Sequence, residues 1–236
     1  MKAEFKPRIY APARTIDGQI LPNDVILVYA IISMLSCSMS ISDTYYMSIR
    51  EIARLIYKIP KPSSRQCNKI MKSIEKINFF IPDAVSSVPD NRDIIKITTK
   101  SFIERDYEKY RYGFVYPEDL DKILNIPDCN VFNICGFYFK YVSTFDTAVN
   151  VGHISSAYVA GLLGVTEQTV KNHIKTLLDC KALMKLKTPS KKVHEHGYYK
   201  FPDIYYRPYD EKFAIKYKQE CNIKYYHNTS KHSQSP

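Results

Sequence analysis

Two clusters of basic side chains are the residues of this sequence best suited to chemistry, and that chemistry is the binding of phosphates and base edges. Six basic residues stand against Glu75 between Lys58 and Lys76, and seven stand against Asp179 between Lys171 and Lys192. A lysine-rich helix face is often only a solvated face, but two clusters at matching places of a repeat favour a shared binding role. We therefore expect both clusters to contact nucleic acid.

Residue type and spacing divide each cluster into two kinds of candidate. Arginine, asparagine and glutamine can each pair with a base edge through two hydrogen bonds, whereas lysine more often holds a phosphate. The candidates for base reading are Arg65, Gln66, Asn68, Gln168 and Asn172. The candidates for phosphate binding are Lys61, Lys69, Lys72, Lys171, Lys175, Lys187, Lys191 and Lys192.

Other kinds of chemistry have less support in the sequence. His194 and His196 flank Glu195, where the metal-binding motif of strand-nicking enzymes needs a bulky apolar residue. The six cysteines form no CxxC pair, and the seven glycines form neither GxGxxG nor GxxxxGK[ST]. Tyrosine could stack on single strands or act as a nucleophile, but a half-buried aromatic is the simpler interpretation. We expect no enzyme, no catalytic residue, no metal and no cofactor.

An internal repeat places the two basic clusters on equivalent elements. Residues 48–56 and 155–163 share an apolar pattern at constant offset, which predicts a short amphipathic helix in each copy. Each is followed by a turn and an N-cap residue, Ser63 or Thr166, which begins a helix carrying the basic cluster. The repeat therefore predicts two helix–turn–helix segments.

Details of the second helices support this interpretation. Ser63 with Gln66 predicts a capping box, and Gly164 supplies the left-handed conformation that ends the preceding helix. The expected inward rows are Cys67, Met71 and Ile74 in the first copy and Val170, Ile174 and Leu177 in the second.

Each copy also has a helix before it and strands after it. The leading helices are expected at 23–37 and 131–145. The hairpin strands are expected at 79–81 with 94–97, and at 182–186 with 198–201.

Helix, helix, turn, helix and hairpin is the order of a winged helix-turn-helix domain, and the chain resembles two such domains in tandem. The match is most specific between Ser155 and Leu186. The expected fold class is α+β, mostly helical with short β-hairpin wings. The expected boundaries are an N-terminal arm at 1–20, a winged-helix domain at 21–102, an acidic linker at 103–127, a second winged-helix domain at 128–208, and a C-terminal helix with a disordered tail at 209–236.

Two winged helices in a chain of this size resemble the replication initiator proteins of plasmids and related mobile elements. In that family the two domains bind adjacent parts of a repeated origin site, and the N-terminal copy often dimerises. The resemblance implies double-stranded DNA as the partner, with a homodimer and the replication machinery as further partners. A transcriptional repressor or autoregulator is an alternative, and so is a non-catalytic protein that binds a nucleoprotein complex.

Composition agrees with a nucleic-acid partner and excludes other classes. The chain has 236 residues and a formal net charge of +10. No uncharged apolar run reaches the roughly 18 residues of a transmembrane helix, and no early apolar block resembles a signal peptide. We therefore expect a cytoplasmic protein with no membrane partner.

Overall fold

A computed structural model describes residues 7–38, 43–88, 91–98, 100–188, 190–193, 197–200 and 203–220. The chain divides into two compact units, 1–143 and 144–236, which are described separately below. Both combine helices with small antiparallel sheets, so the fold class is α+β. Within the described ranges, no helix has the length and apolar character needed to cross a bilayer.

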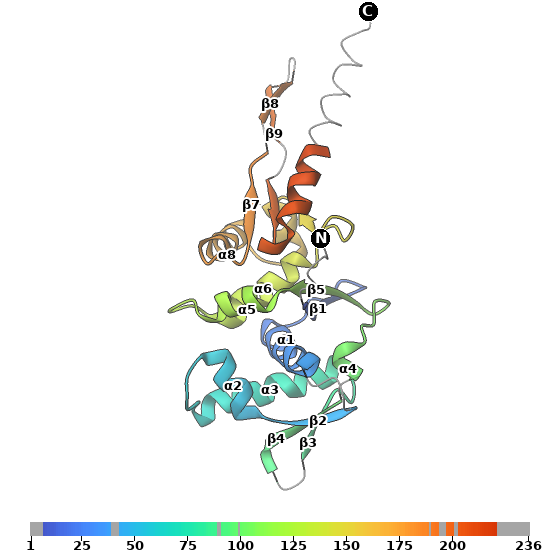
Figure 1. The fold of residues 1–236 in the computed structure, drawn as a ribbon, viewed down its shortest axis with the longest axis vertical. Helices are drawn as coiled ribbons and strands as arrows, with labels where there is room; N and C mark the ends of the chain where they lie inside the picture. Colours follow the sequence, from blue (N-terminus) through green and yellow to red (C-terminus); the bar gives the residue numbers. More distant parts are fainter. Residues whose placement is uncertain are drawn as a thin grey trace, which may run out of the picture. The chain divides into compact units, whose positions relative to one another are not determined.

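The first part of unit 1 is a helical layer on a three-stranded sheet (Figure 1). The strand order is β2-β4-β3, so the first strand pairs with the last strand rather than with the second. The elements are α1 (Asn23–Ser38), β2 (Thr44–Ser48), α2 (Ile49–Tyr57), α3 (Ser64–Phe80), β3 (Val85–Val88) and β4 (Asn91–Thr98).

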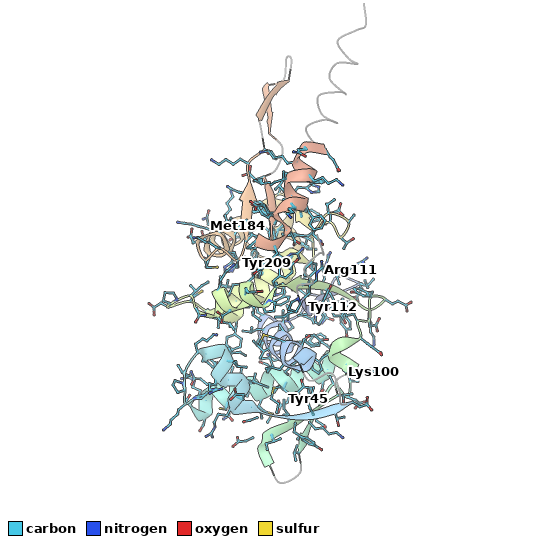
Figure 2. All side chains as sticks on the ribbon, viewed as in Figure 1. Tyr45, Lys100, Arg111, Tyr112, Met184 and Tyr209 are labelled. Carbon is cyan, nitrogen blue, oxygen red and sulfur yellow. The ribbon has the colours of Figure 1, made fainter. Side chains whose placement is uncertain are left out.

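Helix α1 lies at the centre of unit 1, where it contacts α3 on one side and α6 (Val131–Val142) on another. Its residues from Val25 to Ile32 are almost all inaccessible to solvent, as expected for a helix that is apolar on all sides. Tyr45 of β2, labelled in Figure 2, is buried with its hydroxyl group against the side chain of Ser36. The sheet, α1 and α6 therefore share one core.

The second part of unit 1 closes over α1 and revises two expected boundaries. Strand β1 (Ile9–Thr15) pairs antiparallel with β5 (Tyr110–Val115), so residues 9–15 form a strand of the unit and not an arm. Between β5 and α6 lies α5 (Pro117–Leu124), and α4 (Lys100–Ile103) precedes β5. The 103–127 segment carries buried Val115, Leu120 and Ile123, so it belongs to the core and is not a free linker.

Two glycines allow α6 to approach its neighbours closely. A Cβ atom on Gly136 would stand 2.4 Å from Oδ1 of Asn23, and one on Gly113 would stand 2.1 Å from the carbonyl oxygen of Phe139. Because real Cβ atoms do not approach so closely, only glycine fits at these two contacts. Helix α6, the expected leading helix of the second repeat, thus lies in unit 1.

Unit 2 repeats the element order of unit 1 from β2 to β4, with a further hairpin before its last strand. Its sheet has the order β6-β10-β7, in which the first strand again pairs with the last. Val151, Ile204, Tyr206 and Ala214 form a small core. The elements are β6 (Val151–Gly152), α7 (Ser156–Leu163), α8 (Glu167–Asp179), β7 (Met184–Leu186), β8 (Ser190–Val193), β9 (Gly197–Lys200), β10 (Ile204–Tyr206), the 3₁₀ helix η1 (Pro208–Asp210) and a helix at 211–220.

The expected hairpins differ from the observed strands. Helix α3 continues for one turn beyond Lys76, the last residue of its basic cluster. Phe79 and Phe80 are therefore the last residues of α3 and do not begin a strand. In unit 2 the strand that joins β7 is β10, and β8 pairs with β9 as a separate hairpin between them. Outside the described residues lie the first six residues, His194 to His196, and residues 221–236, which include the expected disordered tail.

Candidate nucleic-acid interface

Helix α8 separates an apolar face from a polar one. Its N-cap is Thr166, whose side chain accepts a hydrogen bond from the backbone N–H of Thr169. Val170, Ile174 and Leu177 are buried, which confirms the expected inward row. The opposite face exposes Gln168, Lys171, Asn172 and Lys175.

Two of these exposed side chains are joined as a pair. Nε2 of Gln168 donates a hydrogen bond to Oδ1 of Asn172 at 2.8 Å, across one turn of the helix. The pair retains an acceptor on Gln168 and a donor on Asn172, and exchanging O and N in both amides would still leave one donor and one acceptor. Adenine presents a donor at N6 and an acceptor at N7 in the major groove, whereas guanine presents two acceptors. The pair is therefore complementary to an adenine edge.

Exposed lysines lie on the same helix as this amide pair and after it. Lys171 forms an exposed ion pair with Glu167 at 2.8 Å, whereas Lys175 has no ion pair among the described residues. Lys187 is exposed just after β7. Lys191 and Lys192 have their backbone in β8, and their side chains lie outside what the structure describes.

When the N-caps Ser63 and Thr166 are aligned, α3 and α8 bury different positions, as if α3 were rotated about its own axis. The residues at the places of Val170, Ile174 and Leu177 are then Cys67, Met71 and Ile74. Ile74 is buried as expected, but Cys67 and Met71 are only half-buried, so the expected inward row is confirmed at Ile74 alone. The other buried residues are Ile70, Ser73 and Ile77, because α3 packs against α1 as well as α2.

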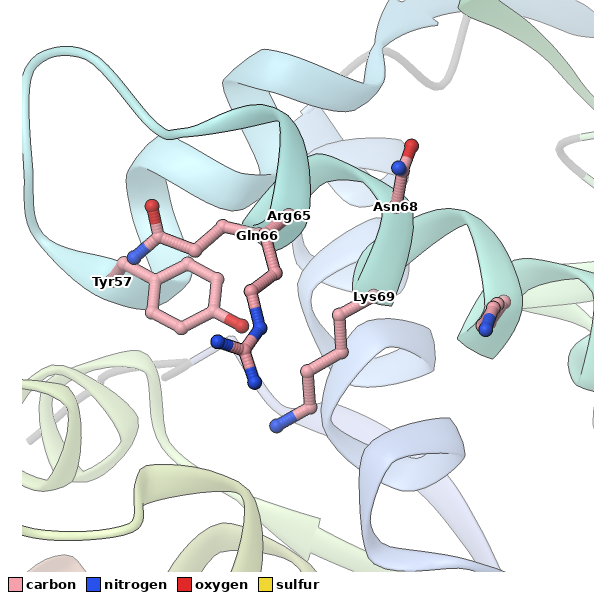
Figure 3. A pocket seen from close by; sticks show the side chains of 6 residues that line it. Tyr57, Arg65, Gln66, Asn68 and Lys69 are labelled. Carbon is pink, nitrogen blue, oxygen red and sulfur yellow. The ribbon is translucent and has the colours of Figure 1, made fainter.

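The base-reading candidates of α3 extend in different directions (Figure 3). Gln66 closes the expected capping box, in which its Oε1 atom accepts a hydrogen bond from the backbone N–H of Ser63 at 2.8 Å. That bond occupies the acceptor which a two-bond contact with adenine would need. Figure 3 shows Arg65 and Lys69 extending to one side of α3, while Asn68 points away from them.

The lysines around α3 have different surroundings. Lys61 and Lys72 are exposed. Nζ of Lys69 lies 3.8 Å from the ring centroid of Phe132 in α6, a cation–π contact. Lys58 and Lys76 are paired with Asp121 at 2.6 Å and with Asp24 at 2.8 Å, so carboxylates offset part of this cluster's charge.

A polar network at the start of α1 has no clear signal in the sequence. Nζ of buried Lys140 donates to Oδ1 of Asn23 at 2.6 Å, and burial lowers the pKa of Lys140 to about 8 against the attraction of Asp24. Burial raises the pKa of the Asp24 carboxyl group. The hydrogen bonds from Lys76 and Ser73 have the larger combined effect and hold the pKa of Asp24 below its usual value. The network links α1, α3 and α6, so it positions α3.

Comparison with known protein families and with curated proteins finds no match to this chain.

Proposed function

We propose that the chain is a sequence-specific double-stranded DNA-binding protein and that α8 is its base-reading helix. The observation that carries the proposal is the exposed face of α8. It presents the hydrogen-bonded pair Gln168 and Asn172 beside the exposed Lys171 and Lys175, while the opposite face is buried. A helix fits the major groove, where amides can read base edges and lysines can hold the flanking phosphates.

The element order supports assigning both units to the winged helix-turn-helix class. In each unit a strand is followed by two helices and then by further strands, of which the last pairs with the first. The helix in the place of a recognition helix, α3 or α8, carries part of the basic cluster of its unit, and in unit 2 the cluster continues beyond the end of α8. In this proposal β8 and β9 form the wing of unit 2, with Lys187, Lys191 and Lys192 near the DNA backbone.

Within this class we assign the chain as a replication initiator of a plasmid or related mobile element. Two basic units in one chain can bind two adjacent parts of a repeated DNA site. Such repeated sites are typical of replication origins. A repressor would make a similar DNA contact at an isolated operator.

Selection from random duplex DNA tests the proposal. The full chain is incubated with a random duplex library, and the bound molecules are recovered and sequenced. Recovery of tandemly repeated sites would support a replication initiator. Recovery of a single palindrome would instead indicate a repressor. Absence of any enriched sequence would contradict sequence-specific binding altogether.

A further inference from the structure

A hollow beside α3 in unit 1 has the size of a small-ligand site. It encloses about 720 Å³ and is lined by Tyr57, Arg65, Gln66, Asn68, Lys69 and Lys72. A second hollow of about 520 Å³ shares Tyr57 and Lys69 and continues to the α5–α6 connection and Phe132. Both volumes fall within the range of about 300–1,000 Å³ that is typical of small-molecule sites.

An aromatic pair forms part of the wall of these hollows. Tyr57, the last residue of α2, lies with its ring centroid 5.7 Å from that of Phe132 at an interplanar angle of 60°. Phe132 is 5% exposed, whereas Tyr57 is half-buried and lines both hollows. Tyr57 therefore contacts a buried ring and keeps part of its own surface open to the hollows, where a planar base can stack on it.

Cationic groups surround the same ring. Figure 3 shows the Arg65 guanidinium group and the Lys69 ammonium group directed to the space beside Tyr57. Arg65, Lys69 and Lys72 have no ion pair among the described residues, in contrast to Lys58 and Lys76. A planar guanidinium group can hold a phosphate through two hydrogen bonds, with lysine as an additional charge.

The hollow is not a copy of the proposed duplex-reading surface of unit 2. With the N-caps aligned, Lys69 stands at the place of Asn172, yet its ammonium group lies over the Phe132 ring. Gln168 has its counterpart in Arg65, which lines the hollow. The side of α3 that corresponds to the reading face of α8 is thus walled by Tyr57 and the α5–α6 connection.

We propose that this hollow binds a nucleotide unit, with the base stacked on Tyr57 and the phosphate held by Arg65 and Lys69. The nucleotide can belong to a single strand or be free in solution, because both supply the same base and phosphate. An acidic peptide would satisfy the cations but has no base for Tyr57. The inference goes beyond the proposed duplex binding and depends on unit 1 alone.

Binding measurements on full-length variants test the inference. The probes are a fluorescently labelled short oligothymidine and a fluorescent ATP analogue, followed by anisotropy, with oligoglutamate as competitor. Tyr57→Phe keeps the ring and should bind as the unchanged protein does. Tyr57→Leu keeps the apolar bulk and should bind roughly 5- to 150-fold more weakly, the loss expected for one stacked base. Arg65→Ala should also weaken binding, whereas Arg111→Ala, an exposed arginine on β5 labelled in Figure 2, should not.

The outcomes separate this inference from the proposed function. Binding of the oligonucleotide alone identifies a single strand as the source, and binding of ATP identifies a free nucleotide; either supports the site. The inference fails if neither probe binds, if Tyr57→Leu and Arg65→Ala bind like the unchanged protein, or if oligoglutamate competes as well as a nucleotide. Duplex binding should be unaffected by Tyr57→Leu, so failure here leaves the role of α8 untouched.

Discussion

At the residue scale, the partners of a side chain decide its role more than its type does. Gln66 and Gln168 both qualify as base readers from the sequence. In the structure Gln66 accepts from the backbone of Ser63, whereas Gln168 donates to Asn172 and keeps an acceptor exposed. The sequence predicted the capping box but could not show that it competes with base reading. Tyr57 and Phe132 could not be paired from the sequence either, because 75 positions separate them.

The buried ammonium group of Lys140 predicts a pH-dependent stability. Its pKa is lowered from 10.5 to about 8 in the folded chain, so between these values the unfolded chain holds more protons. Since stability rises with pH where the unfolded state binds more protons, the free energy of unfolding of the wild type should rise relative to Lys140→Met across this window. Urea unfolding of both proteins at a series of pH values measures the difference. A constant difference would show that Lys140 titrates normally.

At the element scale, local signals predicted helices and caps better than they predicted packing. The N-cap Thr166 of α8 and its buried row follow from local spacing, and Gly164 has the expected left-handed conformation, with a φ of 63°. The rotation of α3 depends on its contacts with α1, and the position of α6 depends on Asn23 and on β5. Such contacts join distant segments, so the spacing of neighbouring residues does not reveal them.

Two glycines in helices should respond oppositely to alanine. Gly136→Ala places a methyl group against Asn23, and overpacking of this kind costs about 1–3 kcal/mol. Gly161→Ala in α7 meets no atom within 4 Å and should stabilise by about 0.5–1 kcal/mol, because alanine restricts the unfolded chain. Urea denaturation of each variant checks both signs. Equal tolerance of the two changes would mean that α6 does not approach α1 as described.

At the scale of the whole molecule, the surplus of positive charge is divided between two units. The first 143 residues carry one basic cluster and the remaining 93 carry the other. The repeat predicted from the sequence matches the shared strand order of the two sheets. The boundary between the units could not be predicted, because the helix that precedes the second copy in sequence packs in unit 1.

Salt dependence measures how much of this charge contacts DNA. If about six to eight phosphates are neutralised, the logarithm of the association constant should fall with the logarithm of salt concentration at a slope of about −5 to −7. Lys175→Ala removes one proposed phosphate contact and should reduce the slope by about 1, whereas Lys212→Ala, an exposed lysine of the 211–220 helix, should leave it unchanged. Titrations of a fluorescent duplex at several salt concentrations give these slopes. A slope near zero for the wild type would exclude a phosphate-dominated interface.

The most direct test of base reading by α8 is discrimination between duplexes that differ at single base pairs. Equilibrium constants are measured for the wild type, Gln168→Ala, Asn172→Ala and the matched control Gln19→Ala, an exposed glutamine of unit 1. The selected duplex and its single substitutions serve as ligands. We expect both α8 variants to lose about 1–3 kcal/mol of discrimination at the same A·T pair while Gln19→Ala retains it. If all four proteins discriminate equally at every position, α8 is not the helix that reads the DNA.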